Sequence, residues 1–360
     1  MKYISLGDCK IDMIVAKEVK FIGGEIFLRK GTVLRNEHIG LLKRLEINGI
    51  FVEEYTTPGI IAESTIDPLT HSEARVLMKE MFTRASFEKS DNDHLFETMT
   101  NTIDDMISQL YESTSETHYI SLLKDYDDYT YQHSVDVGIL SIMIGRSMNL
   151  DRKELFELGK AAFFHDTGKM FIPKEILHKP GRLTEDEFAQ MRKHSIQGYE
   201  FVKNTLGLGE EVAKAVLYHH EKYDGSGYPF GLSGNQIPLH AQIISVADVY
   251  DALNSKRVYK EAMVASEGYE FVMANLGAHF NPEVGQIFLR AVAPFPAGSL
   301  VRLSDSRNAV VIKNNRNLMT RPIIRILNEN PNNPKLSTQS ELIDMAKEPD
   351  MVSVTITARI

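Results

Sequence analysis

The stretch Ala161-Ala-Phe-Phe-His165-Asp166-Thr-Gly168-Lys169 places a histidine and an aspartate directly after an apolar run. Upstream, apolar residues recur at steps of three and four, which predicts an amphipathic helix that Gly168 terminates. The buried face of this helix is predicted to contain Leu155, Leu158, Ala162 and Phe163. An aspartate in such apolar surroundings is costly to bury unless it has a partner, such as a metal ion. The stretch therefore predicts a metal ligand inside a helical core.

Further histidines and an aspartate lie on the apolar faces of other predicted helices. Thr184-Glu-Asp-Glu187 has the form of a capping box, and the helix after it carries Phe188, Met191, His194 and Ser195 on one face. A single histidine of this kind is more often a hydrogen-bonded core residue than a ligand. A whole set of them is hard to bury without a metal. We predict that the ligands are His133, His165, Asp166, His194, His219, His220 and Asp248.

Imidazole and carboxylate groups make up this entire set of predicted ligands. Such a set suits iron, manganese, zinc or nickel and disfavours calcium, magnesium and copper(I). Seven ligands are too many for one ion, and adjacent pairs such as His165-Asp166 and His219-His220 indicate two ions that share a carboxylate. The lone cysteine, Cys9, cannot form a thiolate site by itself.

Composition limits the class of protein and its partners. The chain has 360 residues, of which 43% are hydrophobic and 25% charged, which is typical of a globular protein with two or three domains. Its net charge of −9 argues against a surface that binds a nucleic acid polymer, so an anionic ligand must meet a local group of cations. The single cysteine and the lack of an 18-residue apolar run or a signal sequence predict a cytoplasmic protein without membrane contact.

Four regions follow from the changing sequence pattern. Residues 1–63 are predicted to form a small α+β regulatory module, with a hairpin that turns at Gly23-Gly24, a helix capped by Asn36 and a strand at residues 50–52. Residues 64–117 are predicted to form a helical linker or dimerisation region, opened by the capping box Thr70-His-Ser-Glu73. Residues 118–295 are predicted to be almost entirely helical. Residues 296–360 are predicted to be rich in β-strands, at 300–303, 309–312, 323–327 and 352–360.

One apolar seam in the second region has two interpretations. Its residues recur at alternating steps of three and four, as in one strand of a coiled coil: Phe96, Met99, Ile103, Met106 and Leu110. The seam spans only about two heptads, which favours packing against its own domain. A homodimer seam stays open as the second interpretation.

Several motifs of the third region together resemble the HD-GYP subgroup of HD-domain phosphohydrolases. The motifs are His165-Asp166-Thr-Gly-Lys169, Lys179-Pro-Gly-Arg-Leu-Thr184, His219-His-Glu-Lys-Tyr-Asp-Gly-Ser-Gly227-Tyr228-Pro229 and Asp248-Val-Tyr-Asp-Ala. The resemblance covers roughly residues 118–295 and implies an HD-domain helical bundle as the catalytic core of a mainly α chain. It also implies a bacterial cyclic di-GMP phosphodiesterase that produces linear pGpG, and in some members GMP, with hydroxide that bridges two metal ions.

The same resemblance implies roles for individual residues. His133, His165, Asp166 and Asp248 would hold one ion, and Asp166 would bridge to a second ion held by His194, His219 and His220. Tyr129 stands where members with three metals have a glutamate, so two ions are expected, iron or alternatively manganese. Lys169, which with Asp166 forms the predicted catalytic pair, matches the lysine that contacts the scissile phosphate. Gln242 stands where the family commonly has arginine.

Substrate contacts are predicted from the cations and the aromatic residue near these motifs. Arg257 and Lys260 match the pair that contacts the ligand in the family, and Lys179, Arg182 and Tyr228 are further candidates. Loop cations are often only solvated, and the Gly-Tyr-Pro loop could be a purely structural turn. That loop is also a candidate contact for a signalling protein. Two other functions stay open: a catalytically silent receptor or scaffold, and a hydrolase that prefers 3′,3′-cyclic GMP-AMP.

Overall fold

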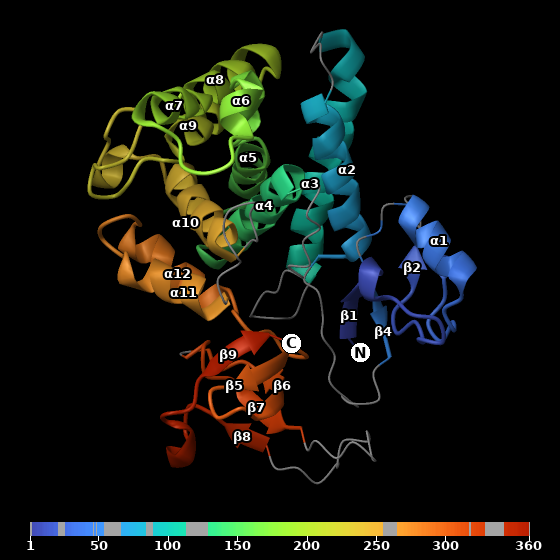
Figure 1. Cartoon of the computed structure of the whole chain (residues 1–360). Coiled ribbons are helices and arrows are strands. Elements are labelled where there is room, and N and C mark those ends of the chain that lie inside the picture. Colours follow the sequence, from blue (N-terminus) through green and yellow to red (C-terminus); the bar gives the residue numbers. More distant parts are fainter. Residues whose placement is uncertain are drawn as a thin grey trace.

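The computed structural model describes most of the chain. The described residues are 2–20, 26–45, 47, 49–53, 66–83, 89–112, 129–254, 265–316, 318–327 and 342–359. Figure 1 shows helices in the middle of the sequence, a small mixed module at the N-terminus and a β-sheet at the C-terminus. The predicted fold class, a mainly α chain with a flanking α+β module and a β-rich module, is confirmed.

The N-terminal module is built from short paired strands and one helix. Strands β1 (Lys2–Ser5) and β4 (Gly49–Val52) pair antiparallel, as do β2 (Val19–Lys20) and β3 (Ile26–Leu28). A 3-10 turn, η1 (Leu6–Asp8), follows β1. The predicted hairpin is thus confirmed in its strands, while its turn at Gly23-Gly24 lies outside the described residues.

Helix α1 (Asn36–Arg44) begins one residue earlier than predicted. The capping residue is Arg35, whose backbone is extended, so the prediction of Asn36 as N-cap was wrong. The ring nitrogen Nδ1 of His38 accepts a hydrogen bond from the Arg35 backbone N–H at 3.2 Å. Leu42 inside this helix is fully buried, whereas Leu45 just after it is exposed.

Two long helices, α2 (Pro68–Thr83) and α3 (Lys89–Glu112), follow the module. Helix α2 begins at Pro68, a residue that suits a first helical turn because it lacks the N–H group. Thr70 therefore lies inside the helix, and the predicted capping box was wrong. The Thr70 hydroxyl instead accepts a hydrogen bond from Nε2 of Gln109 on α3 at 2.8 Å.

The apolar seam of α3 is buried within the chain. Met99, Ile103 and Met106 are completely buried and belong to the same hydrophobic core as the central helices. The ring of Phe96 stacks on Phe164 with centroids 6.0 Å apart. Packing against its own chain is therefore the correct interpretation of the seam, and the seam is not a surface for a second copy.

The central helices enclose this core. Helix α4 packs against α5, α10, α2 and α12, and α8 packs against α9 and the 3-10 turn η2. The helices and turns are α4 (Tyr129–Ser147), α5 (Arg152–Phe163), η2 (Thr167–Phe171), α6 (Lys174–Leu177), α7 (Glu185–Met191), α8 (His194–Glu200), η3 (Phe201–Thr205), α9 (Glu210–Tyr218), η4 (Gly234–Gln236), α10 (Leu239–Asn254), α11 (Ala265–Ala274) and α12 (Pro282–Ala291). The predicted capping box at Thr184 and Glu187 is confirmed at the start of α7.

The C-terminal module is an antiparallel five-stranded sheet in the order β8-β7-β6-β5-β9. The strands are β5 (Leu300–Leu303), β6 (Asn308–Lys313), β7 (Ile323–Ile326), β8 (Leu342–Asp344) and β9 (Ile356–Arg359). The last strand was predicted too long. Pro349 opens a 3-10 turn, η5 (Pro349–Met351), and Val352 after it is 75% exposed, so the strand begins only at Ile356.

Candidate metal centre

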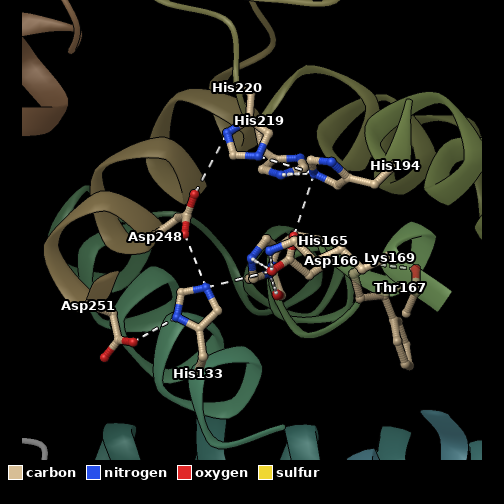
Figure 2. A network of polar contacts seen from close by, with 12 residues as sticks. His133, His165, Asp166, Thr167, Lys169, His194, His219, His220, Asp248 and Asp251 are labelled. Carbon is tan, nitrogen blue, oxygen red and sulfur yellow. Dashed lines mark hydrogen bonds and ion pairs between the residues drawn. The ribbon is translucent and has the colours of Figure 1, made fainter. Parts of the chain in front are cut away.

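The predicted ligands come from five separate segments of the central helices and converge on one point (Figure 2). His133 lies on α4, Asp248 lies on α10, and His194 is the first residue of α8. The turn after α5 carries His165 and Asp166, and the turn after α9 carries His219 and His220. These side chains are buried, apart from His220, which is half-buried.

Helix α5 ends at Phe163, so the prediction that Gly168 terminates it was wrong. Gly168 instead allows η2 to pack against α8. A Cβ atom at this position would lie 1.8 Å from the carbonyl oxygen of His194 and 2.6 Å from the backbone nitrogen of Gly198. The two segments thus touch through backbone atoms, which brings His194 to the same centre as Asp166.

The helix predicted to carry both Phe188 and His194 is broken between them. Helix α7 ends at Met191, and α8 begins at His194 after a short turn. The break leaves the Met191 carbonyl free to accept a hydrogen bond from the His194 ring, because the last carbonyls of a helix lack backbone partners.

Three histidines are oriented by the helix ends that precede them. Each hydrogen-bonds through Nδ1 to the carbonyl oxygen three residues earlier, at 2.7 Å for His165, 2.7 Å for His194 and 2.6 Å for His219. A carbonyl only accepts, so Nδ1 must carry the proton in each ring. The lone pair of each ring is consequently on Nε2, which faces the centre.

His133 is oriented differently because it lies inside α4, where the helix's own hydrogen bonds engage the backbone carbonyls. Its Nδ1 hydrogen-bonds to Oδ2 of Asp251 on α10 at 2.7 Å, and both side chains are buried. This contact is the carboxylate–histidine pair that commonly fixes the ring of a metal ligand. Asp251 was not among the predicted site residues.

Ligand atoms crowd around the centre at distances that need a cation between them. The Nε2 atoms of His194 and His219 are 3.4 Å apart, and those of His194 and His220 are 3.1 Å apart. The lone pairs of His194 and His219 face each other and repel, since neither Nε2 atom can donate a hydrogen bond. Among the described residues, Nε2 of His165 and Oδ1 of Asp166 are buried without a hydrogen-bond partner. The donor set therefore fits a divalent metal ion.

The donor atoms fall into overlapping groups. Asp166, His194, His219 and His220 offer atoms within 4.8 Å of one another, as do His133, His165 and Asp166, and also His165, His219 and Asp248. Asp166 belongs to two groups because one oxygen faces His194 at 3.6 Å and the other faces His165 at 3.4 Å. Asp166 thus lies between two parts of the cluster.

Burial and charge set the protonation states that metal binding needs. Burial and the neighbouring His165 lower the pKa of His219 to about 3, and burial also lowers the pKa of His194 and His220. Burial alone would raise the pKa of Asp166, but Lys169 and His165 hold it well below its ordinary value. These groups are consequently neutral imidazoles and an ionised carboxylate at neutral pH, which are the forms that bind metals.

His133 differs from the other histidines in its charge. Burial works to lower its pKa, but hydrogen bonds to Asp248 and Asp251 outweigh burial and raise the pKa to about 9. Its Nε2 lies 3.1 Å from Oδ1 of Asp248, whose own pKa is held well below the ordinary value by His133 against the effect of burial. A metal ion that binds His133 must therefore displace a proton.

Lys169 and Tyr228 border the cluster. The Lys169 ammonium lies 2.5 Å from Oδ2 of Asp166 and is partly exposed. The Tyr228 ring lies beside His220 with centroids 4.7 Å apart, and burial raises the pKa of its hydroxyl. Both side chains are thus placed where a ligand of the cluster would meet them.

A buried carboxylate supports the Gly-Tyr-Pro loop. Glu221 accepts hydrogen bonds from the backbone N–H groups of Phe230 at 2.8 Å and Leu232 at 3.0 Å. Gly227 packs so closely that a Cβ there would lie 2.3 Å from the Lys222 backbone nitrogen. Tyr228 is therefore held against His220 by the backbone of its own loop.

The remaining predicted substrate contacts have different outcomes. Lys179 forms an ion pair with Glu187 at 2.6 Å, which engages its charge, and Arg182 is exposed. Arg257 and Lys260 lie outside the described residues. Gln242 is buried and hydrogen-bonds to the carbonyl of Ile237 at 2.6 Å, so it has a structural role in the loop before α10.

Sequence reasoning missed three residues at this site. Asp251 and Glu221 act through contacts that only the fold creates. For Asp251 the sequence held one signal, because it lies about one helical turn after the predicted ligand Asp248. Arg192 lies over two aromatic rings, with its Cζ atom 4.3 Å from the Phe188 ring centroid and 5.5 Å from that of Tyr228. Its position two residues before His194 was the available signal.

Comparison with known families agrees with this geometry. Residues 117–284 match the HD domain family, and residues 300–357 match the KOW domain that is associated with HD domains. The chain therefore contains an HD domain, built on the helices that carry the cluster. The HD domain that the motifs of the third region imply is thus confirmed.

Several bacterial phosphodiesterases are similar to part of this chain. The cyclic di-GMP phosphodiesterase PA4108 of Pseudomonas aeruginosa is 41% identical over 204 residues, which cover 57% of this chain and 49% of that protein. The cyclic di-GMP phosphodiesterase response regulator RpfG of Xanthomonas campestris is 42% identical over 152 residues, or 42% of this chain and 40% of that protein. The 3′3′-cGAMP-specific phosphodiesterase 2 of Vibrio cholerae is 38% identical over 161 residues, or 44% of this chain and 31% of that protein. The chain thus spans about half or less of each of these relatives.

In the part of the chain that the structure describes, no helix combines the length and the apolar character needed to cross a bilayer.

Proposed function

We propose that this protein is a metal-dependent phosphodiesterase that hydrolyses cyclic di-GMP to linear pGpG. The observation that carries the proposal is the convergence of five histidines and two aspartates on one buried centre, within an HD domain. Relatives named cyclic di-GMP phosphodiesterases support the choice of substrate.

Two ions are the proposed cofactor, iron or alternatively manganese. His133, His165, Asp166 and Asp248 would hold one ion, and His194, His219 and His220 would hold the other, with Asp166 shared. The position of Asp166 between two donor groups supports this division. Imidazole and carboxylate donors are suited to both metals.

The residues of the chain would each have a defined task around this centre. Divalent ions bound there lower the pKa of coordinated water and polarise phosphate oxygens. Lys169 offers a positive charge next to Asp166 and would stabilise the negative charge that grows on the phosphate during hydrolysis. Tyr228 would contact the ligand beside His220, and Arg182, Arg257 and Lys260 stay proposed ligand contacts. Asp251 would hold His133 in place.

A second substrate, 3′,3′-cyclic GMP-AMP, is favoured by one observation. A relative that is 38% identical over 161 residues is named a 3′3′-cGAMP-specific phosphodiesterase. Both ligands are cyclic dinucleotides with two phosphodiester bonds, so the same metal centre would serve either. A silent receptor is not favoured, because the described ligand set is complete.

We further propose a cytoplasmic location. The Gly-Tyr-Pro loop stays a proposed contact for a signalling protein, and Phe230 next to it is 63% exposed.

The test is anaerobic purification, metal quantification and chromatography of cyclic dinucleotide digests. We expect pGpG from the manganese-loaded chain and a loss of turnover in His165→Ala and Asp166→Ala. His178→Ala is the matched control, because His178 is exposed and lies outside the cluster. Continued hydrolysis by the two cluster variants would contradict the proposed metal role, and binding without product would favour a receptor.

A further inference from the structure

A cation held by two aromatic rings lies at the edge of the metal centre. Arg192 follows the last residue of α7, and its guanidinium contacts the rings of Phe188 and Tyr228. These two rings are roughly perpendicular, with centroids 6.4 Å apart. The Tyr228 ring in turn lies 4.7 Å from the His220 ring, so one side chain separates Arg192 from the cluster.

Among the described residues, no acid engages the charge of Arg192. Within the described ranges, no carboxylate lies within 4.0 Å of Arg192 or of its exposed neighbour Lys193. By contrast, Lys169 pairs with Asp166 and Lys179 pairs with Glu187. Arg192 and Lys193 thus make a positive edge in a protein whose net charge is −9.

The aromatic contacts leave the hydrogen-bonding groups of Arg192 available. Contact with an aromatic ring does not use up the N–H donors of a guanidinium, and among the described residues the Arg192 side chain donates no hydrogen bond. The rings also restrict the long side chain, so less conformational entropy is lost when it binds a ligand. Such an arrangement suits an anion with two oxygens on one group that accept two parallel hydrogen bonds, as a phosphate does.

We propose that Arg192 binds the second phosphate of a cyclic dinucleotide whose first phosphate lies at the metal ligands. This inference rests on the proposed function and names the part of the site that selects its substrate. A cyclic dinucleotide carries two phosphodiester anions, and the metal centre with Lys169 accounts for only one of them. Arg192 and Lys193 are adjacent cations without an acid partner among the described residues, which favours a phosphate over the uncharged edge of a guanine base as the group that Arg192 meets.

The experiment measures binding of analogues that cannot be hydrolysed. Bis-phosphorothioate cyclic di-GMP and bis-phosphorothioate cyclic di-AMP are titrated calorimetrically into the manganese-loaded chain. Arg192→Ala is expected to weaken both by about 10- to 100-fold, the range for loss of a charge-assisted hydrogen-bond pair. Arg192→Lys keeps the charge but loses the bidentate geometry, so a smaller loss is expected. Lys193→Ala is the matched control and should change binding less than Arg192→Ala.

The outcomes separate this inference from the function on which it rests. If Arg192→Ala binds both analogues as the wild type does, or if the wild type binds neither, the phosphate subsite is wrong. A loss confined to the guanine analogue would mean a contact with the base, which also overturns the proposal. Hydrolysis of bis(p-nitrophenyl) phosphate, which has a single phosphate, reports the metal centre separately. A wild type that binds both analogues but hydrolyses no diester would contradict the proposed function and leave the subsite intact.

Discussion

Gly168→Ala tests how the fold positions the metal ligands. The added Cβ would lie 1.8 Å from the His194 carbonyl oxygen, whereas ordinary contacts begin at 3.4 Å. The clash is with backbone atoms, so no side-chain rotation relieves it, and η2 and α8 must separate by roughly 1.5 Å. Forced separations of this kind cost about 1–3 kcal/mol or more of unfolding free energy.

The same separation would damage the cluster. His194 on α8 and Asp166 before η2 face each other at 3.6 Å across this contact. Functional groups must be held within about 0.5 Å of their productive positions, so the variant should bind manganese at least about 10-fold more weakly.

Urea unfolding of the chain in EDTA and calorimetric titration with manganese measure the two effects. Gly40→Ala is the control, because a Cβ there meets nothing within 4 Å inside α1. It should stabilise the protein by up to about 1 kcal/mol, since alanine is the better helix former. Wild-type stability and wild-type metal affinity in Gly168→Ala would refute the reasoning.

Three further substitutions test the partner of His133, the burial of His279 and the packing of α3. Asp251→Ala should weaken manganese binding, measured by calorimetry, by about 10–100-fold, because His133 loses its partner. Asp251→Asn keeps a hydrogen-bond acceptor and should lose less affinity. An Asp251→Ala variant that binds manganese as tightly as the wild type would contradict the positioning role. Burial and Lys222 lower the pKa of His279 to about 4 in the folded protein, whereas the unfolded value is about 6.5. The unfolded chain therefore binds a proton more readily, and the folded state loses stability as the pH falls from about 6.5 to about 4. His279→Gln in EDTA should therefore lose less unfolding free energy than the wild type between pH 7 and pH 5, and an identical loss would refute the assignment. Met99→Ala should lower the free energy of unfolding in urea by about 2–5 kcal/mol at any protein concentration, because Met99 is fully buried within one chain. The control Met273→Ala, at an exposed position, should lower it by under about 0.5 kcal/mol. A loss in Met99→Ala that depends on protein concentration would point to a dimer seam.

Periodicity predicted the helical core and the set of side chains that meet in it. Polar residues on apolar helix faces need partners in the core. That requirement was sufficient to predict that His133, His194 and Asp248 belong to one metal site. The seam of α3 followed from the same periodicity, although only the packed structure decided between its two interpretations.

Helix ends and long-range partners could not be predicted in this way. Helix α5 ends before His165 because the chain turns to meet α8, and Gly168 serves that contact rather than the helix end. The partner of His133 is Asp251, which lies 118 residues away in sequence. The final strand was predicted too long because the apolar alternation continues through Val352, where a turn opened by Pro349 exposes the side chain.

The most direct test of the central claim is an anomalous diffraction map of crystals of the manganese-loaded chain. We expect two peaks among the seven side chains of the cluster, with Asp166 between them. Manganese bound elsewhere, or no peak within reach of His133, His194 and His219, would contradict it.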